Sequence, residues 1–520
     1  MRKLLYLGLL LIFYALSVKA TTYPAATCNE GDVATAINNA IKAAHDGDTV
    51  TIPACPNGVV WTTPLSATFT HSITIQGAGA VSATTGGAAT TGSDSTVIID
   101  NIAGTNHSVI TFTTASGKSL QFTGIAILQN SSSIVSGNGI LNIGGSSTSV
   151  RIDHNHFYIY VSGTKGIVIQ GAVLGVADHN YLDALSGIIT NDFAFYNGAN
   201  WNGSSDGSGH ASWNDSSHFG TSRFFYTEDN RFNYGWFSDC VLGGRYVHRH
   251  NTGTNVSGTA NHGTTFYERG CRAAEIYDNT YNGAPQTGNA TYSNNSGPAL
   301  YWGNTVSSSY QNVVTTAVPR KDNSYSGCCS VPPTGWGYCG TTFNGTGSPW
   351  DQNSNTTTGY ACLDQPARGR GDLLSGNLPT TCNLTLNPAC NVFAGQWPRQ
   401  DLDPIYIFAN TYTTTLLAEN SGMLSVNRDY YLQTGSFTGT AGVGTGVLSA
   451  RPSTCTAGPG GNTPGVGYWA TDTTTLYVCN PTNTWTTYYT PYTYPHPLVT
   501  GGAIGGNLPN PPTSLAATVQ

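Results

Sequence analysis

Short strands of alternating polar and apolar residues recur along the chain, and each is followed by an asparagine. The strands in SVRIDHN, GVADHN, FFYTEDN, RYVHRHN, AAEIYDN, ALYWGN and IYIFAN end at Asn155, Asn180, Asn230, Asn251, Asn279, Asn304 and Asn410. The intervals are 25, 50, 21, 28, 25 and 106 residues, and we interpret the interval of 50 as two coils. One strand and one asparagine per twenty-odd residues predicts a solenoid. Asparagine suits its corners because it tolerates left-handed backbone, and stacked asparagines can pair through their side chains.

The alternation within these strands predicts which residues face the core. Positions three and five before the asparagine are mostly apolar, as in Val150 and Ile152 or Ile405 and Ile407, and should point inward. Positions two before it should form an outward row, in which Glu228 and Arg249 are stacked neighbours and Glu275 lies nearby. The full row reads Asp153, Asp178, Glu228, Arg249, Tyr277 and Trp302. This register also places His248 inward. Either the alignment of this strand is imperfect, or His248 is a buried polar residue.

The residues before the first of these strands have a different pattern. Residues 33–44 predict an amphipathic helix with Ala34, Ile37, Ala40 and Ile41 on its apolar face. The segment HSITIQGAG at 71–79 then predicts a strand and a turn.

Together, the asparagine repeat, the leading helix and the HSITIQGAG segment resemble the right-handed parallel β-helix of pectate lyases and many other secreted polysaccharide-active proteins. The resemblance covers roughly residues 30–435. It implies an all-β solenoid whose first coil is capped by the helix. It also implies a polysaccharide or other glycan as the partner.

The remaining segments divide the chain further. Residues 1–20 read as a signal peptide, with Arg2 and Lys3 before an apolar run, so a secreted or cell-surface protein without a membrane span is expected. An uncleaved anchor is the alternative. The β-helix is predicted over 21–435, with a loop at 197–219 and a disulfide-rich insertion at about 323–400. A small disulfide-closed β module follows at 436–498, and 499–520 is a Gly/Pro-rich linker or tail.

The twelve cysteines and the net charge narrow the class of protein. An even number of cysteines in an exported chain predicts disulfides. Proximity in sequence suggests the pairs Cys28–Cys55, Cys240–Cys271, Cys382–Cys390 and Cys455–Cys479. The net charge of −7 argues against nucleic acid as a partner, and a monomer is expected.

Charged residues are concentrated in one part of a chain that otherwise avoids them. Twelve of the 56 residues from Arg223 to Asp278 are charged, about 21%, against 9% for the whole chain. Cross-strand ion pairs that only stabilise the sheet are the structural alternative. As a functional patch, it offers candidate catalytic residues, namely Arg249, Glu275, Arg245, His250 and His262. Its candidate substrate-binding residues are Arg269, Arg272, Tyr277, Trp302 and Glu228.

Calcium is the cofactor that the sequence favours, since carboxylate oxygens suit this ion. Asp153, Asp178 and Glu228 are the candidate ligands. The resemblance also implies calcium, because exported β-helix lyases of the superfamily that this chain resembles commonly use it. Zinc or copper at His248 and His250, with His210, His218 or His262, is a weaker alternative.

Three functions remain open. Arginine and histidine beside aromatic residues favour a lyase that cleaves a uronic-acid polysaccharide by β-elimination, which needs a base and a positive charge. A glycoside hydrolase would need two carboxyl groups at a set separation. A carbohydrate-binding or adhesin-like surface protein would need neither, and fold alone does not decide between these functions.

Overall fold

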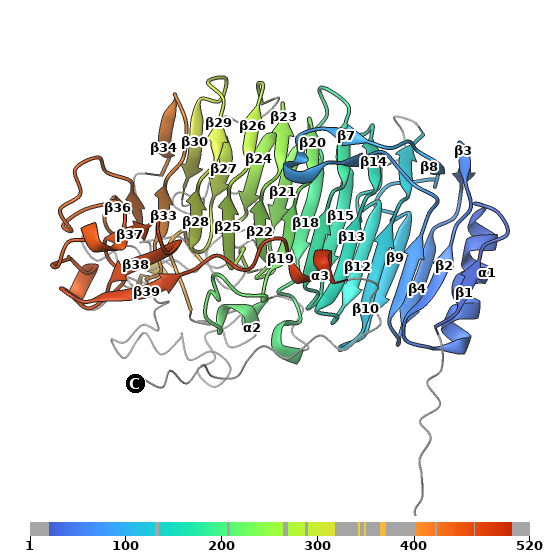
Figure 1. The fold of residues 1–520 in the computed structure, drawn as a ribbon, viewed down its shortest axis with the longest axis horizontal. Helices are drawn as coiled ribbons and strands as arrows, with labels where there is room; N and C mark the ends of the chain where they lie inside the picture. Colours follow the sequence, from blue (N-terminus) through green and yellow to red (C-terminus); the bar gives the residue numbers. More distant parts are fainter. Residues whose placement is uncertain are drawn as a thin grey trace, which may run out of the picture.

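A computed structural model describes residues 20–130, 135–204, 209–263, 269–285, 290–317, 364–370, 402–421, 424–461 and 463–501, with two short strands at 342–343 and 348–349. The chain forms a right-handed parallel β-helix with three long parallel sheets, called A, B and C here (Figure 1). The predicted pair Cys382–Cys390, most of the predicted insertion and residues 1–19 of the predicted signal peptide lie outside the described residues.

Sheet A carries the asparagine corner at the end of its strands. Its twelve strands stack one coil above the next. They are β1 (Thr22–Pro24), β2 (Asp48–Thr51), β5 (Ile73–Gln76), β10 (Ser119–Thr123), β13 (Ser149–Asp153), β16 (Gly175–Asp178), β19 (Phe225–Glu228), β22 (Arg245–Arg249), β25 (Ala273–Tyr277), β28 (Ala299–Trp302), β33 (Ile405–Phe408) and β35 (Tyr430–Leu432).

Sheet B follows that corner in each coil. Its nine strands are β3 (Cys55–Trp61), β8 (Thr96–Asp100), β11 (Ala126–Gln129), β14 (His156–Ile159), β17 (Tyr181–Ala184), β20 (Arg231–Asn233), β23 (Thr252–Thr254), β26 (Thr280–Asn282) and β29 (Thr305–Val306). A small hairpin of β6 (Ser82–Ala83) and β7 (Thr90–Thr91) leaves the body between β5 and β8.

Sheet C closes each coil. Its ten strands are β4 (Leu65–Phe69), β9 (Ile110–Thr114), β12 (Leu141–Gly145), β15 (Lys165–Gln170), β18 (Asn191–Tyr196), β21 (Trp236–Cys240), β24 (Ser257–Asn261), β27 (Ala290–Asn294), β30 (Asn312–Thr316) and β34 (Thr415–Glu419). The strands β31 (Thr342–Phe343) and β32 (Ser348–Pro349) form a separate antiparallel pair.

The asparagine ladder is the most regular feature of the body, and it confirms the sequence repeat. Asn155, Asn180, Asn230, Asn251, Asn279, Asn304 and Asn410 are joined in one line, each side-chain amide donating to the next at 3.0–3.1 Å. The residue before each of the first five asparagines adopts a left-handed φ between 53° and 57°. The ladder therefore satisfies the backbone groups that each corner exposes.

The interval of 50 residues is a single coil, so its interpretation as two coils is wrong. Strand β16 pairs directly with β19, with Asp178 beside Glu228. The extra length leaves the body as a loop containing α2 (His210–Trp213). Likewise β28 pairs with β33, so the interval of 106 is also one coil.

The core and the cap follow the predicted register. Val150, Ile152, Ala274 and Ile276 are fully buried, and His248 is a buried polar residue whose Nε2 lies 2.8 Å from Ser238 Oγ. Helix α1 (Glu30–Ala43) buries Val33, Ala36, Ile37 and Ala40 against the first coil. Disulfides join Cys28 to Cys55 and Cys240 to Cys271, as predicted.

The C-terminal part covers one face of the solenoid. Strands β36 (Val443–Gly446), β37 (Gly467–Ala470), β38 (Thr475–Cys479) and β39 (Trp485–Tyr489) form a sheet closed by the predicted disulfide Cys455–Cys479. Trp469 of this sheet packs against Trp302 and Phe408 of sheet A. Residues 490–501 then run back across the outside of sheet A and end at α3 (Pro497–Thr500), against β13 and β16 (Figure 1). We call residues 490–501 the C-terminal strap.

Candidate functional site

The predicted outward row exists in sheet A in the predicted order. Asp153, Asp178, Glu228, Arg249, Tyr277 and Trp302 are neighbours on successive strands. Their expected exposure to solvent is wrong. All six are at least nine-tenths buried, because the strap and the C-terminal sheet cover this side of the body.

Arg249 is completely buried between the body and the strap. Its Nε donates to Glu228 Oε2 at 2.7 Å, and Nη1 donates to the hydroxyl of Tyr277 at 3.0 Å. Nη1 and Nη2 also donate to the strap carbonyls of Tyr492 and Thr493 at 2.7 and 2.8 Å. These four hydrogen bonds are all internal, and Arg249 holds the strap in place.

The other predicted arginines are buried in the same way. Arg245 donates to carbonyls of the loop that contains α2, and Arg269 makes a two-point ion pair with Asp364. Arg272 donates to the carbonyl of Asp215 in that loop. All three are 0% exposed. These charged side chains therefore lie at the interface between the solenoid and the segments that cover it, namely the loop that contains α2 and the segment at Asp364.

The remaining predicted residues do not form one site. Glu275 is fully buried, accepts from the Gly220 amide at 2.7 Å, and burial raises its pKa to about 7. His250 packs on Tyr494 of the strap, with ring centroids 3.7 Å apart, and burial lowers its pKa to about 4. His262 instead follows β24 in sheet C, where its Nδ1 lies 2.7 Å from Asp239.

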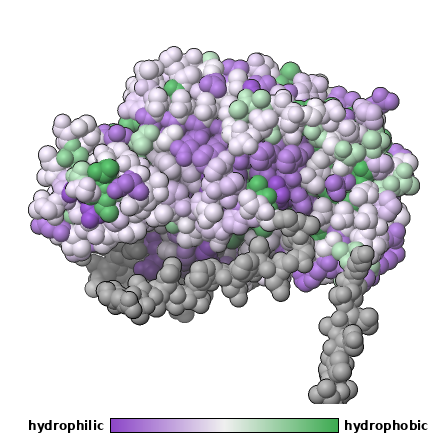
Figure 2. Space-filling view, viewed as in Figure 1, coloured by the Kyte–Doolittle hydropathy of each residue, from purple (hydrophilic) through white to green (hydrophobic). Residues whose placement is uncertain are grey.

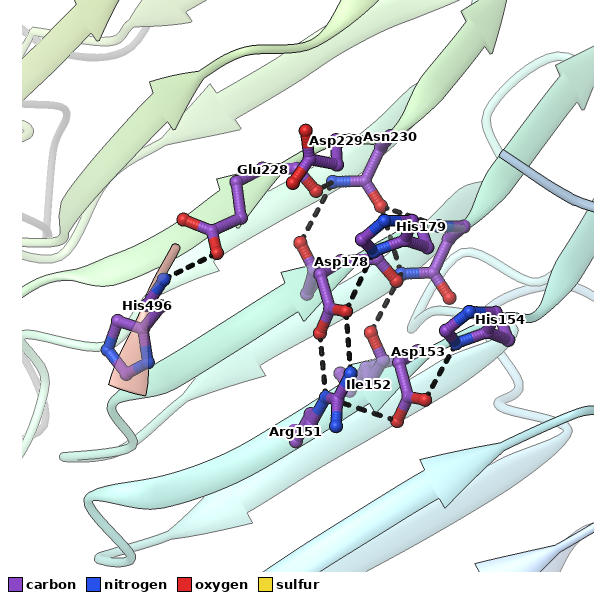
Figure 3. A network of polar contacts seen from close by, with 12 residues as sticks. Arg151, Ile152, Asp153, His154, Asp178, His179, Glu228, Asp229, Asn230 and His496 are labelled. Carbon is purple, nitrogen blue, oxygen red and sulfur yellow. Dashed lines mark hydrogen bonds and ion pairs between the residues drawn. The ribbon is translucent and has the colours of Figure 1, made fainter. Parts of the chain in front are cut away.

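The three predicted calcium ligands lie in one column but are occupied by protein donors (Figure 3). Arg151 donates to both oxygens of Asp178. Asp153 accepts from Gln121, Thr123 and His154, and Glu228 accepts from Arg249 and the His496 amide. Within the described part of the chain, no group of three or more His, Cys, Asp and Glu is arranged to hold a metal ion. Calcium stays a prediction.

Hydrophilic residues gather in the middle of the covered face, where the sheet A corner meets solvent (Figure 2). His154 and His179 lie at this corner, with their rings stacked 5.1 Å apart and their Nδ1 atoms on Asp153 and Asp178 (Figure 3). These contacts orient the rings and account for the raised pKa of His179, which the Asp178 hydrogen bond favours against burial.

A pocket of about 500 Å³ lies instead on the outer side of sheet C, in the N-terminal coils. Its floor includes Ser66, Thr111, Asn142 and Val168, which are neighbours on four successive strands. The turns before these strands and the ends of β15 and β18 supply the rest of the lining, namely Pro64, Asn106, His107, Ser108, Gly137, Asn138, Lys165, Gln170 and Tyr196. Amide and hydroxyl side chains of this kind can bond the hydroxyl groups of a sugar.

His107 is the pocket residue best placed to move a proton. Its Nε2 lies 3.1 Å from Oδ2 of Asp100, a fully buried carboxylate that also accepts from Ser136 Oγ at 2.7 Å. This pairing favours the tautomer with the proton on Nε2 and the lone pair on Nδ1. Nδ1 of His107 is itself buried and, among the described residues, has no hydrogen-bond partner. A carboxylate-oriented imidazole in a pocket is a candidate general base.

Lys165 supplies the positive charge of the pocket. Its Nζ donates to the carbonyl of Gly137 at 2.6 Å, and burial lowers the pKa of this amine. No Asp or Glu is among the described residues that line the pocket. The pocket therefore offers a base and a cation, and not the two carboxyl groups that a glycoside hydrolase needs.

Sequence reasoning missed His107, Asp100 and Lys165. Asp100 and His107 lie in a coil whose corner has no ladder asparagine, since the ladder begins only at Asn155, and Lys165 lies on sheet C of the coil that Asn155 opens. The available signal was an Asp at the end of one apolar strand, TVIID, with a histidine seven residues later. The asparagine repeat marks only the strands of sheet A, whereas the pocket lies on sheet C.

The fold and pocket define a parallel β-helix protein with a polar pocket on an outer sheet face. No protein-family model, curated protein or solved structure matches this chain. Across the described residues, no helix is both long enough and apolar enough to cross a membrane.

Proposed function

We propose that this protein is a secreted polysaccharide-active β-helix protein that binds an acidic glycan in the sheet C pocket. The observation that carries the proposal is that His107, oriented by buried Asp100, lines the same pocket as Lys165. The resemblance to secreted β-helix proteins and the three disulfides support an extracellular setting.

The reaction that these two residues support best is β-elimination at a uronic acid. Lys165 pairs with the sugar carboxylate and stabilises the negative charge that develops when the adjacent carbon loses its proton. Nδ1 of His107, which is buried in the structure, takes that proton once the turn at residues 106–108 moves to admit the sugar. The bond from C4 to the glycosidic oxygen then breaks, a C4–C5 double bond forms, and the leaving oxygen takes a proton from water. No oxidant or metal is required for this balance.

Kinetics of two pocket variants test the proposal. With an acidic polysaccharide that wild type cleaves, we expect His107→Gln to lower kcat by a factor of about 10²–10⁴, the usual contribution of a general base. Lys165→Met should lower kcat/KM, with a larger change on acidic than on neutral glycans. Formation of the unsaturated product is followed by its ultraviolet absorbance.

His262→Gln is the matched control, because this histidine also pairs with an aspartate on sheet C but does not line the pocket. Wild-type activity in His107→Gln would refute the assignment of the base. Binding of acidic glycans without any cleavage would leave a carbohydrate-binding protein in place of a lyase.

A further inference from the structure

Four arginines lie under or beside the loop that contains α2, and none of them lines the sheet C pocket. Arg245, Arg269 and Arg272 are completely buried, and Arg223 is partly exposed at the edge of the loop. A guanidinium keeps its proton inside proteins, so each of these residues needs acceptors or a counter-ion.

Arg245 obtains its acceptors from the loop and has no carboxylate in contact among the described residues. It donates to the carbonyls of Ser212, Ser216 and Ser217 at 2.6–2.8 Å, and Nε donates to Ser212 Oγ at 3.0 Å. The ring of Trp201 covers its other face at 4.4 Å. Its hydrogen bonds are thus neutral, and its charge is not cancelled locally.

Arg272 is less well satisfied. Nη2 donates to the carbonyl of Asp215 at 2.9 Å, and the ring of Trp213 lies 5.2 Å from the guanidinium. Within the described structure, its Nε and Nη1 are buried and have no hydrogen-bond partner. Two unused donors on a fully buried cation cost far more than the loss of one ordinary hydrogen bond.

Among the described residues, the charges of this group do not balance. Four arginines (223, 245, 269 and 272) face three aspartates (215, 364 and 403), which leaves an excess of one positive charge. Asp364 is committed to Arg269, and Asp403 accepts from the Tyr488 hydroxyl. Asp215 points its carboxylate at Trp201 and His218. His218 adds no positive charge at neutral pH, since burial lowers its pKa.

We propose that this cluster binds one small monovalent anion of the halide class, chloride in solution, at Nε and Nη1 of Arg272. One such ion supplies the missing negative charge and accepts from the unused donors. It thereby fixes the loop carbonyls of residues 212–217 against sheet A. This inference does not depend on the proposed function, because none of the four arginines and three aspartates lines the sheet C pocket.

Bromide, which scatters anomalously, locates the ion directly. We expect crystals of the wild-type protein grown in sodium bromide to show an anomalous peak within hydrogen-bond distance of Arg272. In solution, replacing gluconate with chloride at constant ionic strength should raise the unfolding midpoint by about 1.5 °C per tenfold increase in chloride above its dissociation constant.

Arg272→Met should abolish this chloride dependence, and Arg231→Met, which alters an arginine of β20 outside this group of charges, should retain it. If Arg272→Met does not fold, the wild-type crystal and titration still decide. Absence of a bromide peak at Arg272, with only water there, or equal midpoints in chloride and gluconate, would overturn the proposal.

Discussion

Replacing Arg249 with alanine removes the cation that joins the C-terminal strap to the solenoid. The change leaves Glu228 Oε2, the Tyr277 hydroxyl and the carbonyls of Tyr492 and Thr493 without their donor. Glu228, which is 0% exposed in the wild type, keeps one donor among the described residues, the His496 amide. Breaking a buried ion pair from one side costs about 3–5 kcal/mol, against 1 kcal/mol or less for an exposed pair.

Two measurements on the same variant test this magnitude. We expect denaturant unfolding of Arg249→Ala to show the larger loss, and limited proteolysis to cut within the strap before the body. Arg223→Ala, whose guanidinium is 3.6 Å from Asp215 and partly exposed, is the control and should lose about 1 kcal/mol or less. The double variant Arg249→Met with Glu228→Leu leaves no unpaired charge and should recover part of the loss. A loss below 1 kcal/mol in Arg249→Ala, with a protected strap, would refute the reasoning.

Three further predictions concern stability. Asn230→Ala removes three donated and two accepted bonds of the ladder and should cost about 3 kcal/mol or more, as denaturant unfolding would show; a change under 1 kcal/mol would contradict the role of the ladder. Burial raises the pKa of Glu275 to about 7, so the protonated side chain stabilises the folded state fully at pH values below the pKa that Glu275 has in the unfolded chain. This contribution is lost as the pH rises to about 7, so the free energy of unfolding of the wild type should fall by about 3 kcal/mol relative to Glu275→Gln across that range. Parallel pH profiles of the two proteins would contradict this. Replacing Cys240 and Cys271 together should lower stability by about 3 kcal/mol, measured by thermal unfolding against the wild type, and an unchanged midpoint would show that the ladder alone holds these coils.

The fold was predictable because its strongest signal is local. The interval between asparagines, the alternation around them and the left-handed corner all depend on residues within one coil. Arg249 beside Glu228 and His248 inside the core follow from that register alone. The residues within one coil do not determine which distant segment covers the outer face of a strand.

The prediction that the charged row is exposed to solvent was wrong for this reason. The strap that covers Arg249 comes from Tyr492 and Thr493, more than 240 residues later in the chain. Nothing in the periodicity of sheet A indicates where a distant segment returns. The pocket residues were missed because Asp100 and His107 precede the ladder, and Lys165, in the first ladder coil, lies on sheet C rather than sheet A.

The most direct test of the account is a crystal structure of the His107→Gln variant with an oligosaccharide of a uronic acid. The account predicts that the sugar lies over sheet C, with its carboxylate at Lys165 and the reacting carbon facing residue 107. An oligosaccharide bound on the sheet A side, or its absence from the pocket at concentrations that saturate binding in solution, would contradict it.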